Sequence, residues 1–369
     1  MNKKPTAAQD HFFAIIPAGG VGSRLWPLSR ASAPKFLHDL TGSGQTLLQD
    51  TWDRLSPLVG NRMMVVTGDV HAATVNKHLP DLDPANLILE PSPKDSTAAI
   101  ALAAAVLYKR DPKVIVGSFA ADHVIGNNGK LLRAIEASIE IAATGKIVTI
   151  GIVPTEASVA FGYIKKGSPI SGTEGFEVAD FIEKPNIKKA GKFVASKKYL
   201  WNAGMFIAPA KLLLDVLAKT QPRLHAGVME LAEHWDTENR TEKLHSIWPG
   251  LDKIAIDYAI AEPAAKLGLV AVVPGNFEWH DVGDFAAIAE LQSQGNSNNL
   301  AVLGSAKVLS DSSSGILVSD TNRLVALIGL EDIIVVDTAD ALLITTKVHA
   351  QKVKAMVEAL KQTGHSDLL

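Results

Sequence analysis

Cysteine is missing from all 369 residues of this chain. Its absence excludes disulfides, zinc–thiolate sites, iron–sulfur clusters and thiol nucleophiles together. Long apolar runs are missing as well, since none approaches the roughly 18 residues that a membrane-spanning helix needs. The apolar run behind the polar N-terminus is five residues long and stops at Pro17, which is too short for a signal peptide. We therefore expect a cytoplasmic protein with no membrane partner.

A strong charge of either sign is also missing. The 36 lysines and arginines nearly balance the 39 aspartates and glutamates, which leaves a net charge of −3. Nothing in this balance favours nucleic acid or an anionic membrane as a partner. A chain with 47% hydrophobic and 20% charged residues is typical of a globular protein. Its length suits one large domain, or a large and a small one.

The first two thirds of the chain alternate between apolar, β-rich runs and helical patterns. The runs that predict strands are 12–16, 63–67, 87–89, 114–119 and 147–152. The helical patterns include 97–108 and 131–143. Fully apolar strands separated by helices indicate an α/β, Rossmann-like domain whose mixed, mostly parallel sheet is covered on both faces. Ligands of such sheets bind beyond the carboxyl ends of the strands.

The best domain boundary is the polar, turn-rich stretch 292–299. We expect a catalytic domain at 11–291 and a small β-rich domain at 300–369. The short β-like runs beyond the boundary are 301–309, 315–318, 324–328, 333–336 and 341–345. A closing helix follows from the i, i+3, i+4, i+7 spacing of Val353, Met356, Val357 and Leu360. The pattern predicts a short β-helix-like domain that serves packing or dimerisation.

Glycines and cations gather directly behind the first predicted strand, as Gly19, Gly20, Gly22, Arg24 and Lys35. This is not a dinucleotide fingerprint, because Leu25 stands where the third glycine is needed, and it is not a P-loop, because no Lys-Ser/Thr pair follows. The glycine N–H groups could wrap phosphate oxygens, which the guanidinium and the ammonium would also bind. A tight strand-to-helix turn with a solvated arginine is the alternative.

The whole string 19–30 (GGVGSRLWPLSR), with Pro34 and Lys35 behind it, resembles the signature loop of the sugar-nucleotide pyrophosphorylases. Its LWPLSR ending is similar to the mannose-1-phosphate guanylyltransferase branch. Further segments agree in the family's order: 90–98, 120–123, 161–164, 181–185, 201–206, 256–259 and 279–283. Two departures are visible: Phe119-Ala120 stand where relatives usually have Leu-Pro, and Asp95-Ser96 where many have Asn-Thr.

The resemblance implies that a sugar-1-phosphate oxygen attacks the α-phosphorus of a nucleoside triphosphate and expels pyrophosphate, with GTP and mannose 1-phosphate as substrates. The nucleophile is already an anion, so catalysis consists of positioning and charge neutralisation. Mg²⁺ suits this task. By resemblance, Asp122 and Asp281 hold the metal. From the residues alone, either could be a turn or N-cap aspartate.

The resemblance also assigns the remaining site residues. The catalytic set is Arg24, Lys35, Asp122, Lys184 and Asp281. The nucleotide-binding set is Ala18, Gly19, Gly20, Gly22, Ser23, Arg24, Lys35, Glu90, Ser96 and Asp122. The sugar-phosphate set is Gly162, Glu183, Lys184 and Asn202. Asp257 and Glu262 are weaker candidates, since the first could be a helix N-cap and the second an exposed helical residue. His123 and His280 each neighbour a proposed metal ligand, and we interpret them as structural or supporting residues.

Two of these assignments have an ordinary alternative. The segment 183–185 could be a solvated charged turn. Glu90 could be a surface acid at a strand end, yet a carboxylate there could accept from the adjacent N1–H and N2–H₂ donors of guanine, which adenine and uracil do not offer.

Two other functions stay open, namely the same chemistry on another nucleotide or hexose phosphate, and a non-catalytic regulatory family member. The joint presence of the five catalytic candidates argues against the regulator. Bifunctional relatives carry a further isomerase domain, whereas this chain ends about 70 residues after the predicted boundary, so we expect one activity. A homodimer formed through the C-terminal domain is expected.

Overall fold

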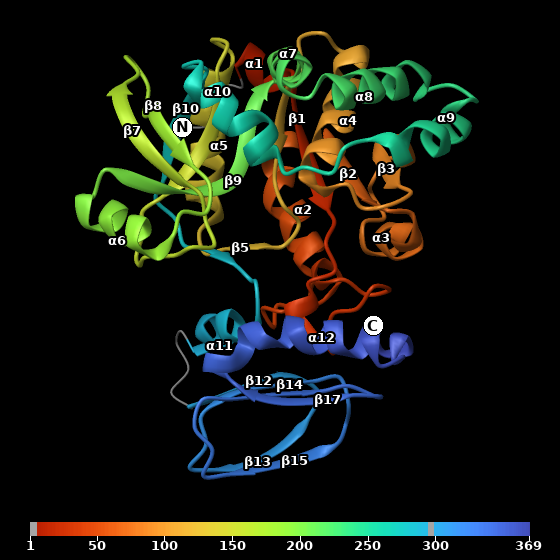
Figure 1. Ribbon diagram of the computed structural model, residues 1–369, viewed down its shortest axis with the longest axis vertical. Helices are drawn as coiled ribbons and strands as arrows, with labels where there is room; N and C mark the ends of the chain where they lie inside the picture. The colour runs from red at the N-terminus through yellow and green to blue at the C-terminus, as the bar shows by residue number, and fades with distance from the viewer. Residues whose placement is uncertain (1–5, 294–298) are drawn as a thin grey trace.

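Within residues 6–293 and 299–369, which the computed structural model describes, nine strands form one central sheet in the order β3-β2-β1-β4-β9-β6-β10-β8-β7 (Figure 1). In chain order these strands are β1 (Phe12–Ala18), β2 (Met63–Gly68), β3 (Leu87–Glu90), β4 (Ile115–Ser118), β6 (Ile147–Ile152), β7 (Tyr163–Pro169), β8 (Phe176–Ile182), β9 (Tyr199–Pro209) and β10 (Val270–Gly275). The five strands predicted from apolar runs are all present.

The sheet is mixed. Strands β3, β2, β1 and β4 are parallel neighbours, and β6 is parallel to β10. Strand β9 runs antiparallel to β4, β6 and β7, and β8 runs antiparallel to β10 and β7. The α/β, Rossmann-like fold class with a mixed sheet is therefore confirmed, but the sheet is not mostly parallel, because four of its strand pairings are parallel and five are antiparallel. The antiparallel part consists largely of strands that the apolar runs did not predict.

Helices cover both faces of this sheet. They are α1 (Ala7–Asp10), α2 (Leu47–Val59), α3 (Ala72–His78), α4 (Asp95–Arg110), α5 (Asn128–Ala142), α6 (Ile187–Ser196), α7 (Ala210–Thr220), α8 (Pro222–His234), α9 (Arg240–Ile247) and α10 (Glu262–Lys266). Side chains of β1 alternate between the faces, as strand geometry requires. Ile15 joins the core under α4, α7 and α8, whereas Ala14 and Ile16 join the core under α2 and α5.

The C-terminal strands form two smaller sheets below the nine-stranded sheet and its helices, which together we call the upper body (Figure 1). One has the order β12-β14-β16-β17, and the other pairs β13 with β15. Their bounds are β12 (Leu300–Gly304), β13 (Lys307–Asp311), β14 (Gly315–Ser319), β15 (Leu324–Ile328), β16 (Ile333–Asp337) and β17 (Leu342–Thr346). Parallel, in-register stacking of β12, β14 and β16 is β-helix-like, as expected. The run expected at 301–309 is two strands, β12 and β13, rather than one.

Two helices lie between the upper body and these strands, α11 (Phe285–Ser293) and α12 (Val353–Gln362) (Figure 1). Most of the predicted boundary at 292–299 lies outside the described residues, which omit 294–298. Within the described part of the chain, no helix combines the length and the apolar composition that a membrane crossing requires.

Candidate active site

The glycine loop leaves the sheet where β1 ends, at the buried Ala18. Gly20 and Gly22 adopt positive φ angles of 87° and 73°, which a residue with a Cβ rarely adopts. A Cβ on Gly19 or Gly20 would meet open space, whereas one on Gly22 would lie 2.9 Å from Cβ of Lys35. The first two glycines therefore present free backbone beyond the sheet edge, and Gly22 allows Lys35 to pack against the loop. Ser23 begins a short 3-10 turn, Ser23–Leu25.

A two-stranded ribbon brings the predicted metal ligands together. Strand β5 (His123–Ile125) pairs antiparallel with β11 (Trp279–Asp281), and Asp281 lies opposite His123. Asp122 directly precedes β5, so the two aspartates meet although 159 residues separate them (281 − 122). This ribbon lies below the main sheet, between the upper body and the C-terminal strands (Figure 1).

Lys35 joins both aspartates. Its Nζ lies 2.5 Å from Asp122 Oδ2 and 3.6 Å from Asp281 Oδ1. The same ammonium donates to the carbonyl of Val282 at 3.2 Å. Arg24 reaches the same segment, where its Nη1 donates to the carbonyl of Gly283 at 3.5 Å. Four residues of the predicted catalytic set, from three distant parts of the sequence, therefore converge.

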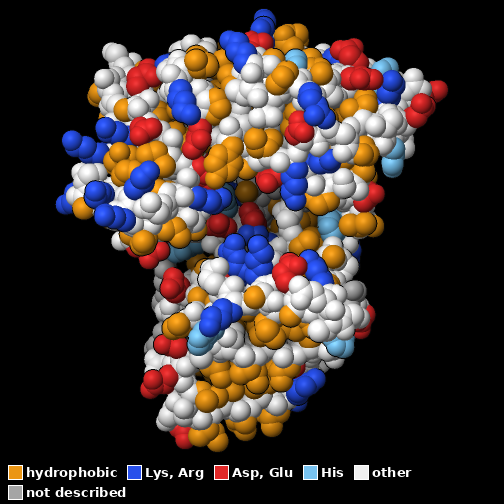
Figure 2. Space-filling model, in the orientation of Figure 1, with side chains coloured by type: hydrophobic (Ala, Val, Ile, Leu, Met, Phe, Trp, Pro, Cys, Tyr) orange, Lys and Arg blue, Asp and Glu red, His pale blue; other side chains and the backbone are white. Residues whose placement is uncertain are grey.

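Electrostatics favour the charged forms of Lys35 and Asp122. Burial alone would lower the pKa of Lys35, but Asp122 and Asp281 outweigh it and the pKa is raised. Burial would raise the pKa of Asp122, yet the Lys35 ammonium holds it below the usual value. Burial lowers the pKa of His123, whose ring contacts Trp279 edge-on at 5.4 Å between ring centroids. His123 therefore supports the ribbon as a neutral side chain. Figure 2 shows a hollow on this face between the upper body and the C-terminal part, with acidic and basic side chains at its edge.

A second polar cluster contains the predicted sugar ligands. Glu183 is buried, and its Oε1 lies 3.0 Å from Nζ of the exposed Lys184. Its Oε2 has no hydrogen-bond partner within the described residues. A Cβ on Gly162 would lie 2.5 Å from that oxygen, and the Gly162 carbonyl accepts from the backbone N–H of Asn202 at 2.8 Å. Gly162 is therefore needed because the carboxylate approaches the backbone.

The Asn202 side chain is held on both sides. Its Oδ1 accepts from Thr149 Oγ1 at 2.7 Å and from the Gly204 N–H at 3.1 Å. Its Nδ2 donates to Asp257 Oδ1 at 2.8 Å. Burial, followed by the nearby Glu183 carboxylate, raises the pKa of Asp257 to about 7. The Asn202 amide is thereby fixed in orientation.

Two weaker candidates have definite contacts. Asp257 is the first residue of a π-helical turn (Asp257–Ala261) rather than its N-cap, because Ile256 holds that position. Glu262 accepts from the backbone N–H of Glu183 at 3.1 Å and is partly buried, so it is not an exposed helical residue.

On the nucleotide side, Glu90 ends β3 and is only 7% exposed. Its Oε1 has no hydrogen-bond partner in the described chain, and burial raises its pKa to about 7. A strand-end surface acid is therefore the wrong description of Glu90. The Ser96 hydroxyl accepts from the backbone N–H of Ile256 at 2.9 Å and ties the start of α4 to the segment before Asp257.

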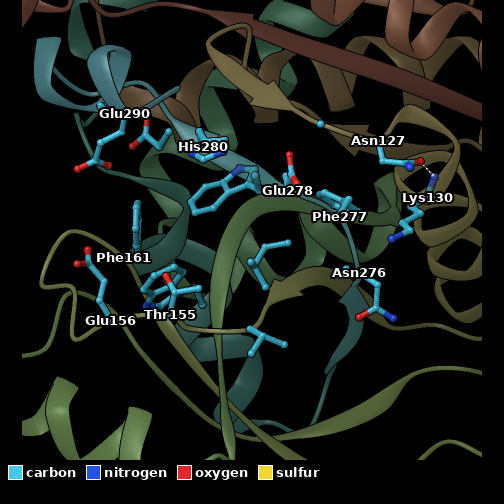
Figure 3. A pocket seen from close by; sticks show the side chains of 18 residues that line it. Asn127, Lys130, Thr155, Glu156, Phe161, Asn276, Phe277, Glu278, His280 and Glu290 are labelled. Atoms are coloured by element: carbon cyan, nitrogen blue, oxygen red, sulfur yellow. Dashed lines mark hydrogen bonds between the residues drawn. The ribbon is translucent and has the colours of Figure 1, made fainter. Parts of the chain in front are cut away.

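Sequence reasoning missed an aromatic cavity of about 790 Å³ beside the β5–β11 ribbon. Phe161 packs against Trp201 and Trp279, with ring centroids 5.1 and 4.9 Å apart. Figure 3 shows Thr155, Glu156 and Phe161 on one side of this cavity, with His280 and Glu278 across from them and Asn127 and Lys130 at its far end. Its aromatic residues are dispersed in the sequence, so no local pattern could reveal it.

Arg54 of α2 was missed as well. It is buried, and its Nη1 donates to the carbonyl of His123 at 3.2 Å, next to Asp122. A lone arginine in an amphipathic helix gives no sequence signal of such a contact.

The donor set fits a hard divalent cation held in part by the substrate. No group of three or more histidine, aspartate or glutamate side chains suitable for a metal exists among residues 6–293 and 299–369. Asp122 and Asp281 nevertheless meet around one ammonium, which shows that two carboxylates share one cation here. Mg²⁺ commonly takes one or two carboxylates and completes its shell with phosphate oxygens and water.

Comparisons with known proteins agree with this geometry. Residues 13–298 match the family model described as nucleotidyl transferase, and residues 306–360 match the MannoseP isomerase/GMP-like beta-helix domain. A mannose-1-phosphate guanylyltransferase of Escherichia coli is 36% identical over 361 residues, which cover 96% of this chain and 74% of the relative. A second relative, the mannose-1-phosphate guanylyltransferase RfbM of Salmonella typhimurium, is 33% identical over 365 residues, which cover 96% of this chain and 74% of that relative. A structure from Thermus thermophilus, described as a mannose-1-phosphate geranyltransferase, superposes with a TM-score of 0.84 at 28% identity and covers 95% of this chain and 99% of that one.

Proposed function

The chain belongs to the mannose-1-phosphate guanylyltransferase family of nucleotidyl transferases, and we propose that it condenses GTP with α-D-mannose 1-phosphate to GDP-mannose and pyrophosphate. The observation that carries this proposal is the convergence of Arg24, Lys35, Asp122 and Asp281 around one point beyond β1 and β4. With a divalent cation on the two aspartates, such a cluster would supply the positive charge that a triphosphate attacked by a second anion requires.

The proposed reaction needs no general base and no covalent intermediate. An oxygen of the sugar phosphate is already ionised and attacks the α-phosphorus, the bond to the pyrophosphate oxygen breaks, and pyrophosphate leaves with its charge. Positioning in line and charge neutralisation supply the rate. Arg24, Lys35 and the free backbone of Gly19 and Gly20 would bind the phosphates of GTP.

Asp122 and Asp281 would hold Mg²⁺. The bound cation would supply a positive charge shared between the transferring phosphoryl group and the leaving pyrophosphate. Both carboxylates lie against the Lys35 ammonium, which offsets part of their charge. With the aspartates engaged by the cation, the Lys35 ammonium would be available to phosphate.

For the sugar phosphate, Glu183 Oε2 is a buried acceptor without a partner in the described chain, and it suits a hexose hydroxyl. The exposed ammonium of Lys184 suits the phosphate group. Glu90 is proposed to read guanine, because a carboxylate can accept from both edge donors of that base and Oε1 has no hydrogen-bond partner among the described residues.

Three further features are proposed with the activity. Residues 11–291 form the catalytic domain and 300–369 the C-terminal domain. The protein is placed in the cytoplasm, where nucleoside triphosphates and sugar phosphates are made. A homodimer through the C-terminal domain is supported by apolar side chains exposed on its strands, namely Leu324, Ile328, Leu342 and Ile344. Figure 2 shows apolar surface gathered on this lower part.

Pyrophosphate release tests the proposal directly. Each of the four nucleoside triphosphates is paired with mannose 1-phosphate and with glucose 1-phosphate at saturating Mg²⁺. We expect the highest kcat/KM for GTP with mannose 1-phosphate. Faster release with another triphosphate would refute the base assignment, and faster release with glucose 1-phosphate would refute the sugar assignment.

A further inference from the structure

The four-stranded C-terminal sheet, β12-β14-β16-β17, is covered on both faces. Every residue of β14 and β16 is buried. Leu317 and Val335 face the second sheet, whereas Ile316 and Ile334 point the other way. On that side they share one hydrophobic core with residues from the upper body, including Leu25, Leu40, Leu47, Val282 and Phe285. The C-terminal part therefore shares one core with the residue after Arg24 and the residue after Asp281, and its helix α12 contacts the turn Ser23–Leu25.

Two polar contacts fix the same junction. The guanidinium of Arg30 forms a two-pronged pair with Asp340, at 2.8 Å from Nη1 to Oδ2 and 2.5 Å from Nη2 to Oδ1. The indole N–H of Trp26 donates to the backbone carbonyl of Leu368 at 2.7 Å. Both contacts join the stretch just behind the glycine loop to the C-terminal part, so neither side chain keeps these donors for a nucleotide.

The stretch 25–30 is also bonded to the glycine loop itself. The Ser29 hydroxyl donates to the carbonyl of Val21, and the Lys35 N–H donates to the same carbonyl at 3.4 Å. The Leu25 N–H donates to the carbonyl of Gly22 at 2.8 Å. A displacement of 25–30 would therefore move the backbone of the loop and the root of Lys35.

We propose that residues 25–30 are a docking strip, through which the C-terminal part, by its β16–β17 turn, helix α12 and last residues, holds the phosphate-binding loop and Lys35 in their binding geometry. Arg30, Trp26 and Asp340 are positioning residues, and they touch no substrate. The proposal rests on the proposed function only in that Arg24, Lys35 and the loop bind phosphate. The signature stretch from Leu25 to Arg30 thereby has a physical role, although its side-chain donors are bonded within the protein and not free for phosphate.

The test removes the ion pair and measures the loop directly. Asp340→Ala and Arg30→Ala should each raise backbone hydrogen exchange in 19–35 by about three- to tenfold, the scale of one well-oriented ion pair. The double variant should add little to either single change, because both remove one interaction. The dissociation constant for inorganic pyrophosphate, from calorimetry with Mg²⁺, should rise by a similar factor, whereas KM for mannose 1-phosphate stays unchanged.

Lys347→Ala is the matched control. It removes a comparable ion pair with Asp332, at 3.2 Å, inside the C-terminal part and away from the strip. It should leave both exchange in 19–35 and pyrophosphate binding as in the wild type. Asp340→Glu keeps the carboxylate and should restore most of the protection.

Hydrogen exchange does not depend on turnover, so the two proposals fail separately. A wild-type protein that releases no pyrophosphate would refute the proposed function, whereas unchanged exchange in 19–35 in both single variants would overturn the docking strip. Should Asp340→Ala raise exchange throughout the chain, Trp26→Phe decides instead, because it removes only the indole donor. Unchanged exchange in 19–35 in that variant would likewise overturn the proposal.

Discussion

Replacing Lys35 by methionine should make the free protein bind divalent cations more tightly. The Lys35 ammonium lies within 3.6 Å of both Asp122 and Asp281 and is only 12% exposed, so an incoming cation must displace it. Methionine keeps the aliphatic stem that packs against Gly22 and removes the charge. The two carboxylates would then face each other without a cation.

The structure sets the size of this effect. Two unit charges at such separations attract by about 5 kcal/mol at an effective dielectric constant of ~20. Rehydration of the displaced ammonium offsets most of that attraction. We expect a net change of about 1.5–3 kcal/mol, which lowers the dissociation constant by about 10- to 100-fold.

Electron paramagnetic resonance titration with Mn²⁺, without GTP, measures this constant. Lys146→Met is the control, because it removes a remote ion pair with Glu177, at 2.8 Å. It should leave Mn²⁺ binding unchanged. Equal or weaker Mn²⁺ binding by Lys35→Met, with an unchanged melting temperature, would refute the competition between ammonium and metal.

Three further predictions concern the metal ligands, the sugar phosphate and the nucleotide. Asp122→Ala and Asp281→Ala should each abolish turnover, because one preorganised charge-stabilising group is worth roughly 10²-fold or more in rate. The far-ultraviolet circular dichroism spectrum should stay that of the wild type. A rate above about a tenth of wild type at saturating Mg²⁺ would contradict the metal assignment. Lys184→Ala should raise KM for mannose 1-phosphate and leave GTP binding by calorimetry nearly unchanged, and an equal loss of GTP affinity would show that Lys184 serves the triphosphate. Glu90→Gln should weaken GTP binding and also change stability with pH. Burial raises the pKa of Glu90 from 4.5 to about 7, so the native state holds a proton that the unfolded state has lost between those values, and stability falls as the pH rises through that window. Relative to wild type, the free energy of unfolding of the glutamine variant should therefore increase from pH 4.5 to pH 8 by on the order of 3 kcal/mol in urea titrations, and a difference independent of pH would contradict the raised pKa.

Local signals made part of this site predictable. Strand β1 is a continuous apolar run. The glycines that follow it indicate a loop, and the cations Arg24 and Lys35 stand close behind them in the sequence. The strands β2, β3, β4 and β6 follow the same rule because parallel strands buried on both faces need apolar residues throughout. Strand β7 escaped this rule because Lys165 and Lys166 interrupt its apolar pattern and its last two residues are exposed. Strand β9 escaped it because Asn202 and Gly204 interrupt its apolar pattern.

Pairings between distant segments could not be read from the chain. Nothing near His123 indicates that it lies opposite Asp281, since this register is set by the path of the chain between them. The same holds for Glu262, whose carboxylate accepts from the Glu183 backbone. The stretch after Arg24 could be identified as part of the family's signature loop. The sequence did not indicate that Leu25 shares a core with residues some 300 positions later, in the last strands.

The contacts of Asn202 restrict what the proposed sugar site can recognise. Its Oδ1 already accepts from Thr149 and Gly204, and one of its two amide hydrogens is donated to Asp257. One N–H therefore remains for a ligand, while the neighbouring Glu183 contributes Oε2 as an acceptor without a partner in the described chain. One donor beside one acceptor matches two adjacent hydroxyl groups, of which one donates and the other accepts. The amide cannot exchange these roles by flipping, because the Gly204 N–H requires an acceptor and the carboxylate of Asp257, when ionised, requires a donor. The stereochemical preference of this half of the site is therefore set by buried residues that do not themselves touch the sugar.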